Sequence, residues 1–162
     1  MSKPKTLLLI TFFCLIFFQT DFYGSKAKKL NVVGIFTDLK PLGSSSYEAH
    51  IKIFSFIMGK SPANSRTLSF RVKGPKKSAF IKTLYKNTFQ KYVIFFELTV
   101  KGGLVFFNKS HIAWLLLDKK CDQCSKKLQG IQLGDGKGGS HTLELHYCPI
   151  HGEKDEIHEY YD

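Results

Sequence analysis

The sequence predicts a mainly β protein: a small five-stranded barrel or open sandwich with one short helix, followed by a β-hairpin. Three observations predict this. Several segments alternate apolar and polar residues with a period of two, which is typical of strands. One segment spaces its apolar residues by four, which favours a helix. Near the C-terminus, two short cysteine and histidine motifs flank a glycine-rich stretch.

The N-terminus has the pattern of a secretory signal. Lys3 and Lys5 precede Thr6–Phe18, which is almost wholly apolar. A helix of this length would span about 20 Å, which is shorter than a hydrocarbon core of about 30 Å. We therefore expect a cleaved leader, cut after Ala27, with a cut after Gly24 as the close rival. The protein is then exported, either secreted, periplasmic or in a secretory lumen. The alternative is an uncleaved leader that anchors the protein in a membrane, in which case only the leader would contact the membrane.

The body of the chain contains the strand patterns. Thr67–Lys73 is the clearest, because Leu68, Phe70 and Val72 fall on one face. Gly102-Gly103 predicts a tight hairpin turn. The predicted strands are Asn31–Thr37, Tyr47–Met58, Thr67–Lys73, Lys91–Lys101, Leu104–Phe107 and Ile112–Leu117. The last is a continuous apolar run and predicts a central strand.

One segment of the body favours a helix. Ser78–Thr88 spaces Phe80, Leu84 and Thr88 by four. The Ser78 hydroxyl is the expected N-terminal cap, and Gly74-Pro75 ends the preceding strand.

The order strand, strand, strand, helix, strand, strand over Leu30–Asp118 resembles the OB-fold, a five-stranded Greek-key barrel. The resemblance rests on element order and not on a motif, and a small open sandwich or a twisted sheet with one helix fits the same order. We divide the chain into a signal peptide (1–27), a basic β-rich domain (28–118), a C-terminal module (119–152) and an acidic tail (153–162) that we expect to be frayed.

The C-terminal module carries the sharpest chemistry of the chain. Cys121 and Cys124 form one close pair, and Cys148 and His151 form a second after 23 residues. Two such pairs at the ends of a β-hairpin can meet around one tetrahedral ion, which predicts a four-ligand zinc site. The motif C-P-x-H-G resembles a knuckle of the zinc-ribbon family, and the resemblance extends from Cys121 to about Gly152. His151 stands where zinc ribbons more often carry a cysteine. The resemblance implies a structural zinc and no catalysis.

Two other interpretations of the cysteines stay open. Exported proteins usually oxidise their cysteines, so one disulfide with a free thiol is one alternative. The other is a redox pair formed by Cys121 and Cys124, which would make the protein a thiol oxidoreductase or a metal-handling protein. His146 is the best substitute ligand if His151 does not bind.

The charge of the chain is divided unevenly. Residues 26–120 hold 18 Lys and Arg against 4 Asp and Glu, whereas residues 121–162 hold 4 against 8. A strongly basic body favours an anionic partner, although a solvated basic face has the same composition. The first candidates for the anion contact are Arg71, Lys73, Lys76, Lys77, Lys82 and Lys86. Aromatic residues lie between them, which is the pattern of a site for single-stranded nucleic acid.

No catalytic residue is predicted, because the sequence contains no nucleophile elbow, phosphate loop or dinucleotide fingerprint. We therefore expect an exported, non-enzymatic binding module with a structural zinc site. Its partner would be an anionic macromolecule or a protein assembly of an envelope or secretion system. A thiol enzyme and a single-stranded nucleic-acid-binding protein are the alternatives.

Overall fold

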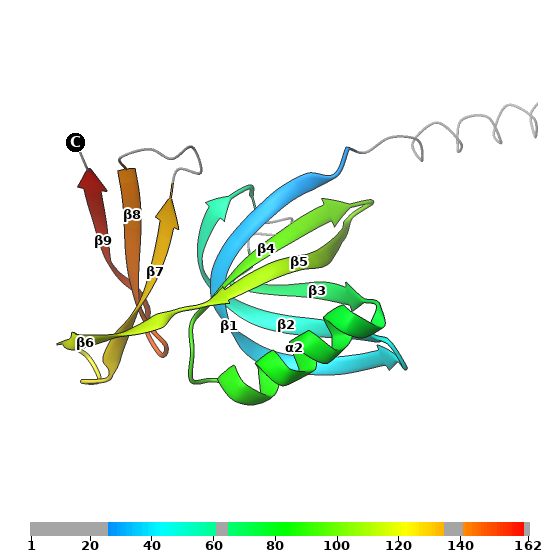
Figure 1. Ribbon diagram of the computed structural model, residues 1–162, viewed down its shortest axis with the longest axis horizontal. Coiled ribbons are helices and arrows are strands. Elements are labelled where there is room, and N and C mark those ends of the chain that lie inside the picture. The colour runs from blue at the N-terminus through cyan, green and yellow to red at the C-terminus, as the bar shows by residue number, and fades with distance from the viewer. Residues whose placement is uncertain (1–25, 61–64, 135–140, 161–162) are drawn as a thin grey trace, which may run out of the picture.

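The computed structural model describes residues 26–60, 65–134 and 141–160 (Figure 1). These residues are mainly β, with one helix and two sheets. The first sheet and its helix comprise β1 (Lys28–Gly43), β2 (Ser46–Met58), β3 (Thr67–Lys73), α2 (Pro75–Thr88), β4 (Ile94–Lys101) and β5 (Leu104–Ile112). The second sheet comprises β6 (Trp114–Lys120), β7 (Lys127–Gly134), β8 (His141–Cys148) and β9 (Gly152–Tyr160). Residues 1–25, nearly all of the predicted leader, and most of the glycine-rich stretch lie outside the described residues.

The first five strands form a mixed sheet that closes on itself as a barrel, in the order β1-β2-β3-β5-β4. β1 closes it because this long strand pairs with β2 along one edge and with β4 along the other. β3 and β5 run parallel and meet at Arg71 and Phe106. The β1–β2 register is irregular at Gly34, where a Cβ atom would collide with the carbonyl oxygen of Lys52 on β2. The glycine therefore permits the close approach of the two strands.

The predicted alternation is confirmed in β3, where Leu68, Phe70 and Val72 are buried in the barrel core. β4 is different, since neighbouring residues on both of its faces are buried. Phe96 points into the barrel and packs edge-to-face against Phe36, whereas Phe95 belongs to a second core outside it. β1 is buried on both faces in the same way. The adjacent strands β1 and β4 therefore form the wall of the barrel that another layer covers.

The helix begins three residues before the predicted start. Pro75 occupies its first turn, where the missing N–H costs nothing, and Gly74 precedes it with φ of 92°. Ser78 is not the cap: its side chain is buried and its hydroxyl donates to the carbonyl of Ser45, 2.8 Å away. Ile81 and Leu84 pack into the barrel core, while Phe80 stays 48% exposed. The helix therefore covers the barrel with a narrower face than the sequence suggests.

The prediction that Ile112–Leu117 is a central strand is wrong. β5 ends at Ile112, the chain passes the buried Ala113, and β6 then runs along the edge of the second sheet. Leu117 is 74% exposed. Apolar composition alone does not distinguish a buried central strand from an edge strand, which is why the prediction failed for this segment.

The hairpin predicted between the two cysteine motifs is present as β7 and β8, which pair from Gln129 with Tyr147 to Gly134 with Thr142. The expectation of a frayed C-terminal segment is wrong for Gly152–Tyr160. This segment forms β9 and pairs along the length of β8. The second sheet thus has the order β6-β7-β8-β9.

The two sheets share a second core, which fastens them to each other. From the barrel it contains Val33, Ile35, Val93 and Phe95, and from the second sheet Ile131, Leu145 and Tyr147. The buried Gln129 side chain spans the junction, accepting from the N–H of Val93 at 2.6 Å and donating to the carbonyl of Lys91 at 2.7 Å. The second sheet stands beside the barrel in Figure 1, and β6 reaches it directly from β5.

Candidate metal centre

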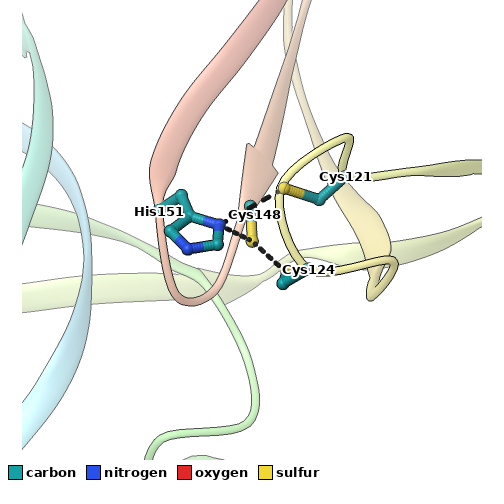
Figure 2. A group of neighbouring side chains, drawn as sticks. All are labelled: Cys121, Cys124, Cys148 and His151. Atoms are coloured by element: carbon teal, nitrogen blue, oxygen red, sulfur yellow. Dashed lines mark hydrogen bonds between the residues drawn. The ribbon is translucent and has the colours of Figure 1, made fainter.

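Two tight turns at one end of the second sheet bring three cysteines and a histidine together (Figure 2). We call residues 121–126, which join β6 to β7, the first knuckle, and residues 148–152, which join β8 to β9, the second knuckle. Cys121 and Cys124 come from the first, and Cys148 and His151 from the second. β7 and β8 are neighbours in the sheet, so their turns lie side by side.

The four ligand atoms lie close enough together to bind one metal ion. All four lie within 4.8 Å of one another. The sulfur of Cys121 is 3.3 Å from His151 Nδ1, and that of Cys148 is 3.6 Å from the same nitrogen. The sulfurs of Cys124 and Cys148 are 3.6 Å apart. Bonds of about 2.3 Å to a central ion give tetrahedral edges of about 3.8 Å, so the four residues lie close enough to bind one metal ion.

The three cysteines are free thiols. A disulfide would place two sulfurs about 2.05 Å apart, far closer than the 3.6 Å between Cys124 and Cys148. Cys121 and Cys148 are buried, Cys124 is partly buried and His151 is exposed. The arrangement therefore presents sulfur donors from inside the fold and the imidazole from its surface.

Backbone N–H groups in both knuckles support the thiolate form of two cysteines. Burial raises the pKa of the Cys121 thiol, but hydrogen bonds from His151 and from the N–H groups of Gln123 and Cys124 outweigh burial and lower this pKa. Burial likewise raises the pKa of Cys148, and the N–H groups of His151 and Ile150 reverse that shift, so the net pKa is lowered. Thiolates are the form that binds metal, so these contacts prepare both sulfurs as ligands.

The pKa of the Cys124 thiol shifts in the opposite direction. The N–H of Lys126 lowers its pKa, but burial and the neighbouring Cys148 and Cys121 together raise it. Three sulfurs held this close cannot all ionise without a positive charge among them. A bound cation would remove this conflict, so the set as a whole suits a metal better than three free thiols.

His146 does not belong to this cluster. Its side chain is buried, with Nε2 2.6 Å from a carboxylate oxygen of Glu144 and Nδ1 3.3 Å from the amine of Lys119. Asp155 lies 3.7 Å from the same Nδ1. Both ring nitrogens are therefore engaged elsewhere, and the structure gives no support to His146 as a substitute ligand.

The candidate anion-binding residues divide into groups. Arg71, Lys73 and Lys77 line one surface depression of about 260 Å³, together with Lys101 and Phe106. We call these five residues the basic patch. The amine of Lys73 lies 5.2 Å from the centre of the Phe106 ring, in cation–π geometry. Lys77 donates to the carbonyl of Phe107 at 3.2 Å.

The other three candidates do not line the depression of the basic patch. Lys76 lines an adjacent depression with Phe80 and His111, and Lys77 and Phe107 line both depressions. Lys82 and Lys86 line neither of them. Sequence reasoning missed Lys101 and Phe106. The Gly102-Gly103 turn was a signal for them, because a hairpin places residues just before and just after its turn side by side, and the patch also needed the parallel pairing of β3 with β5.

Comparison with known proteins gives no match to a protein-family model and no significant match to a curated protein or a solved structure. Among the described residues, none of the helices has the length and apolar character needed to cross a membrane. Function must therefore be argued from the metal cluster and the surface of the protein itself.

Proposed function

We propose that this protein is an exported, non-enzymatic binding module in which a structural zinc ion holds the second sheet and the barrel presents a basic surface to an anionic partner. The observation that carries the proposal is the placement of three sulfurs and one imidazole nitrogen within 4.8 Å of one another. A Cys₃His set in tetrahedral spacing is an ordinary structural zinc site. All four positions are taken by protein atoms, which leaves no open position for a reacting ligand.

Topology supports the two family resemblances. The closed order β1-β2-β3-β5-β4, with the helix between β3 and β4, fits the OB-fold. Two knuckles joined through the β7–β8 hairpin fit a zinc ribbon. In this proposal the chain is an OB-like barrel with a zinc-ribbon-like sheet packed on its β1–β4 wall.

The basic patch supports an anionic partner. It combines four cations with the Phe106 ring, and none of the described residues that line the depression is acidic. Cations beside an accessible ring suit a flexible polyanion, including single-stranded nucleic acid, because phosphates and planar groups alternate along it. An anionic component of an envelope or secretion assembly would present similar charge.

A matched pair of double variants tests the patch. Lys73→Gln/Lys77→Gln removes two charges from the patch, and Lys82→Gln/Lys86→Gln removes two charges from the helix outside it. Binding to heparin and to a single-stranded oligonucleotide is measured by fluorescence anisotropy between about 50 and 200 mM salt.

We expect affinity to fall steeply with salt and to fall about tenfold more in the patch variant than in the helix variant. Equal losses in the two variants would show that net charge alone attracts the polyanion. The absence of binding at low salt would contradict the proposal.

A further inference from the structure

A second depression among the described residues is larger than that of the basic patch. It is a cavity of about 720 Å³ between β2 and the second knuckle. Its lining from the barrel consists of Lys52, Ile53, Phe54, Phe56, Gly59, Lys60, Ser65 and Arg66, and its lining from the second sheet consists of His151 and Gly152. We call this cavity the inter-sheet groove. Its volume lies within the range of about 300–1,000 Å³ that small-molecule sites occupy.

The groove is positively charged. Lys52, Lys60 and Arg66 line it, and none of the described lining residues is acidic. Arg66 is exposed, and its guanidinium can bind a phosphate through two parallel hydrogen bonds. Lys52 lies in the middle of β2, Lys60 just after its end and Arg66 just before β3, so all three cations line the groove from the barrel side.

Two aromatic rings, those of Phe54 and Phe56, line the groove together with Lys52. Phe54 is already held: its ring stacks on Tyr147 with centroids 6.1 Å apart, and Lys52 lies 5.7 Å from its centre. Phe56 is 37% exposed. The Phe56 ring is therefore the apolar surface that the groove offers to a ligand.

His151 links the groove to the metal centre. Its Nδ1 faces the sulfurs of Cys121 and Cys148, and Figure 2 shows its other nitrogen, Nε2, turned away from all three cysteines. Within the described part of the chain, Nε2 has no hydrogen-bond partner. A histidine that binds metal through one nitrogen normally donates the N–H of the other to an oxygen acceptor. Here that donor belongs to a residue that lines the groove.

We propose that the inter-sheet groove binds a phosphate group carried on a planar ring, in a ligand the size of one nucleotide. The phosphate lies among the cations and accepts the Nε2–H of His151, while the ring packs on Phe56. A bare phosphate would fill only a small part of 720 Å³ and would leave Phe56 without a role. The inference rests on the proposed metal centre in one respect, since His151 must use Nδ1 for the metal.

The site has a consequence for the metal. An acceptor on Nε2–H makes the imidazole a stronger ligand, so the phosphate ligand and the metal stabilise each other. Binding in the groove should therefore slow the removal of metal by a chelator. The basic patch, which shares no lining residue with the groove, should not have this effect.

The test uses adenosine 5′-monophosphate as the probe, with inorganic phosphate, adenosine, a thymidine oligonucleotide and a hexaglutamate peptide beside it. Titration calorimetry on the metal-loaded full chain gives affinity, and elemental analysis gives metal content. The groove variants are Phe56→Ala, Arg66→Gln and His151→Cys. The last keeps a metal ligand at this position but removes the outward N–H. Lys73→Gln in the basic patch is the matched control for Arg66→Gln.

We expect the monophosphate to bind more tightly than phosphate or adenosine, and each groove variant to weaken it about tenfold with metal content unchanged. The control should bind normally. Tighter binding of the oligonucleotide that Arg66→Gln weakens and Lys73→Gln leaves unchanged would mean that the groove binds a nucleotide within a chain. Tighter binding of the monophosphate would mean that the groove binds a free nucleotide.

Equal affinity of the groove variants and the wild type, no binding of either nucleotide probe, or preference for the glutamate peptide would overturn the inference. If the protein binds metal but fails these tests, only the proposed ligand site in the groove is wrong. A protein without metal in wild type and His151→Cys alike would contradict the proposed zinc site instead.

Discussion

The barrel and the knuckle end of the second sheet are stabilised in different ways. The barrel core contains sixteen buried residues drawn from five strands and the helix. The knuckle cluster contains three buried residues, Cys121, Leu128 and Cys148, and two of these are candidate ligands. Burial of apolar surface can hold the barrel, whereas three small side chains cannot hold two turns. We therefore propose that the knuckles depend on a bound metal and that the barrel does not.

Removal of the metal should give the largest effect and should separate the two regions. Chelation, or Cys148→Ser, deletes a contribution of order 10 kcal/mol in apparent free energy, on the scale of small zinc domains. We expect amide hydrogen exchange to become fast at the knuckle ends of β7 and β8 while Val32 and Phe96 in the barrel keep their protection. Unchanged protection of Tyr147 and Cys148 without metal would show that the turns hold themselves.

A cavity in the barrel core should give the opposite pattern. Phe96 is fully buried between Phe36 and Phe70, with ring centroids 5.3 Å from each. Phe96→Ala should lower the free energy of unfolding by about 4 kcal/mol, measured by denaturant titration. Metal stoichiometry below the unfolding transition should stay at the wild-type value. Loss of metal at denaturant concentrations where the barrel is still folded would mean that the two regions are not independent.

At the junction between the regions, one buried amide adds two hydrogen bonds to the apolar second core. Gln129 is buried and satisfies both the N–H of Val93 and the carbonyl of Lys91. Gln129→Met removes both hydrogen bonds and leaves the buried N–H of Val93 and the partly buried carbonyl of Lys91 unpaired, at a cost of about 2 kcal/mol. We expect calorimetry to resolve two transitions in place of one cooperative transition. A single transition shifted as a whole would indicate that the apolar part of the second core alone couples the sheets.

Weakening the contact between β6 and β7 should give the smallest loss of stability. Trp114 lies across Gly130 on β7, where a Cβ would come within 2.8 Å of the indole ring. Gly130→Ala should displace Trp114 and destabilise the edge of the second sheet by about 1–2 kcal/mol. Trp114 is the single tryptophan of the chain, so its emission should shift to longer wavelength. Emission like that of the wild type would show that β6 is held by its backbone pairs instead.

The two regions also differ in how well the sequence predicts them. Period-two alternation predicts barrel strands that have one buried face and one solvent-exposed face, and β3 is the clearest example. Residue spacing predicted the four clustered donors, because Cys121 and Cys148 each precede a second donor by three residues. Both signals are local, and they name the elements and the metal cluster.

Contacts between distant elements left no local signal. The pairing of β3 with β5, which makes the basic patch, joins residues 35 positions apart at Arg71 and Phe106. β1 and β4 have apolar residues on both faces because their outer faces belong to the second core. Composition alone does not say which layer covers those outer faces. The position of Ile112–Leu117 was predicted wrongly for the same reason. The inter-sheet groove requires both sheets in place and could not have been found from spacing.

We propose that a metal ion, and not a disulfide, holds the two knuckles together. The direct measurement is elemental analysis of the protein purified without chelator, with a thiol count on the same sample after denaturation in chelator. We expect one zinc ion per chain and expect Cys121, Cys124 and Cys148 all to react as thiols. A protein with no bound metal, and with one reactive thiol and one disulfide per chain, would contradict the proposal.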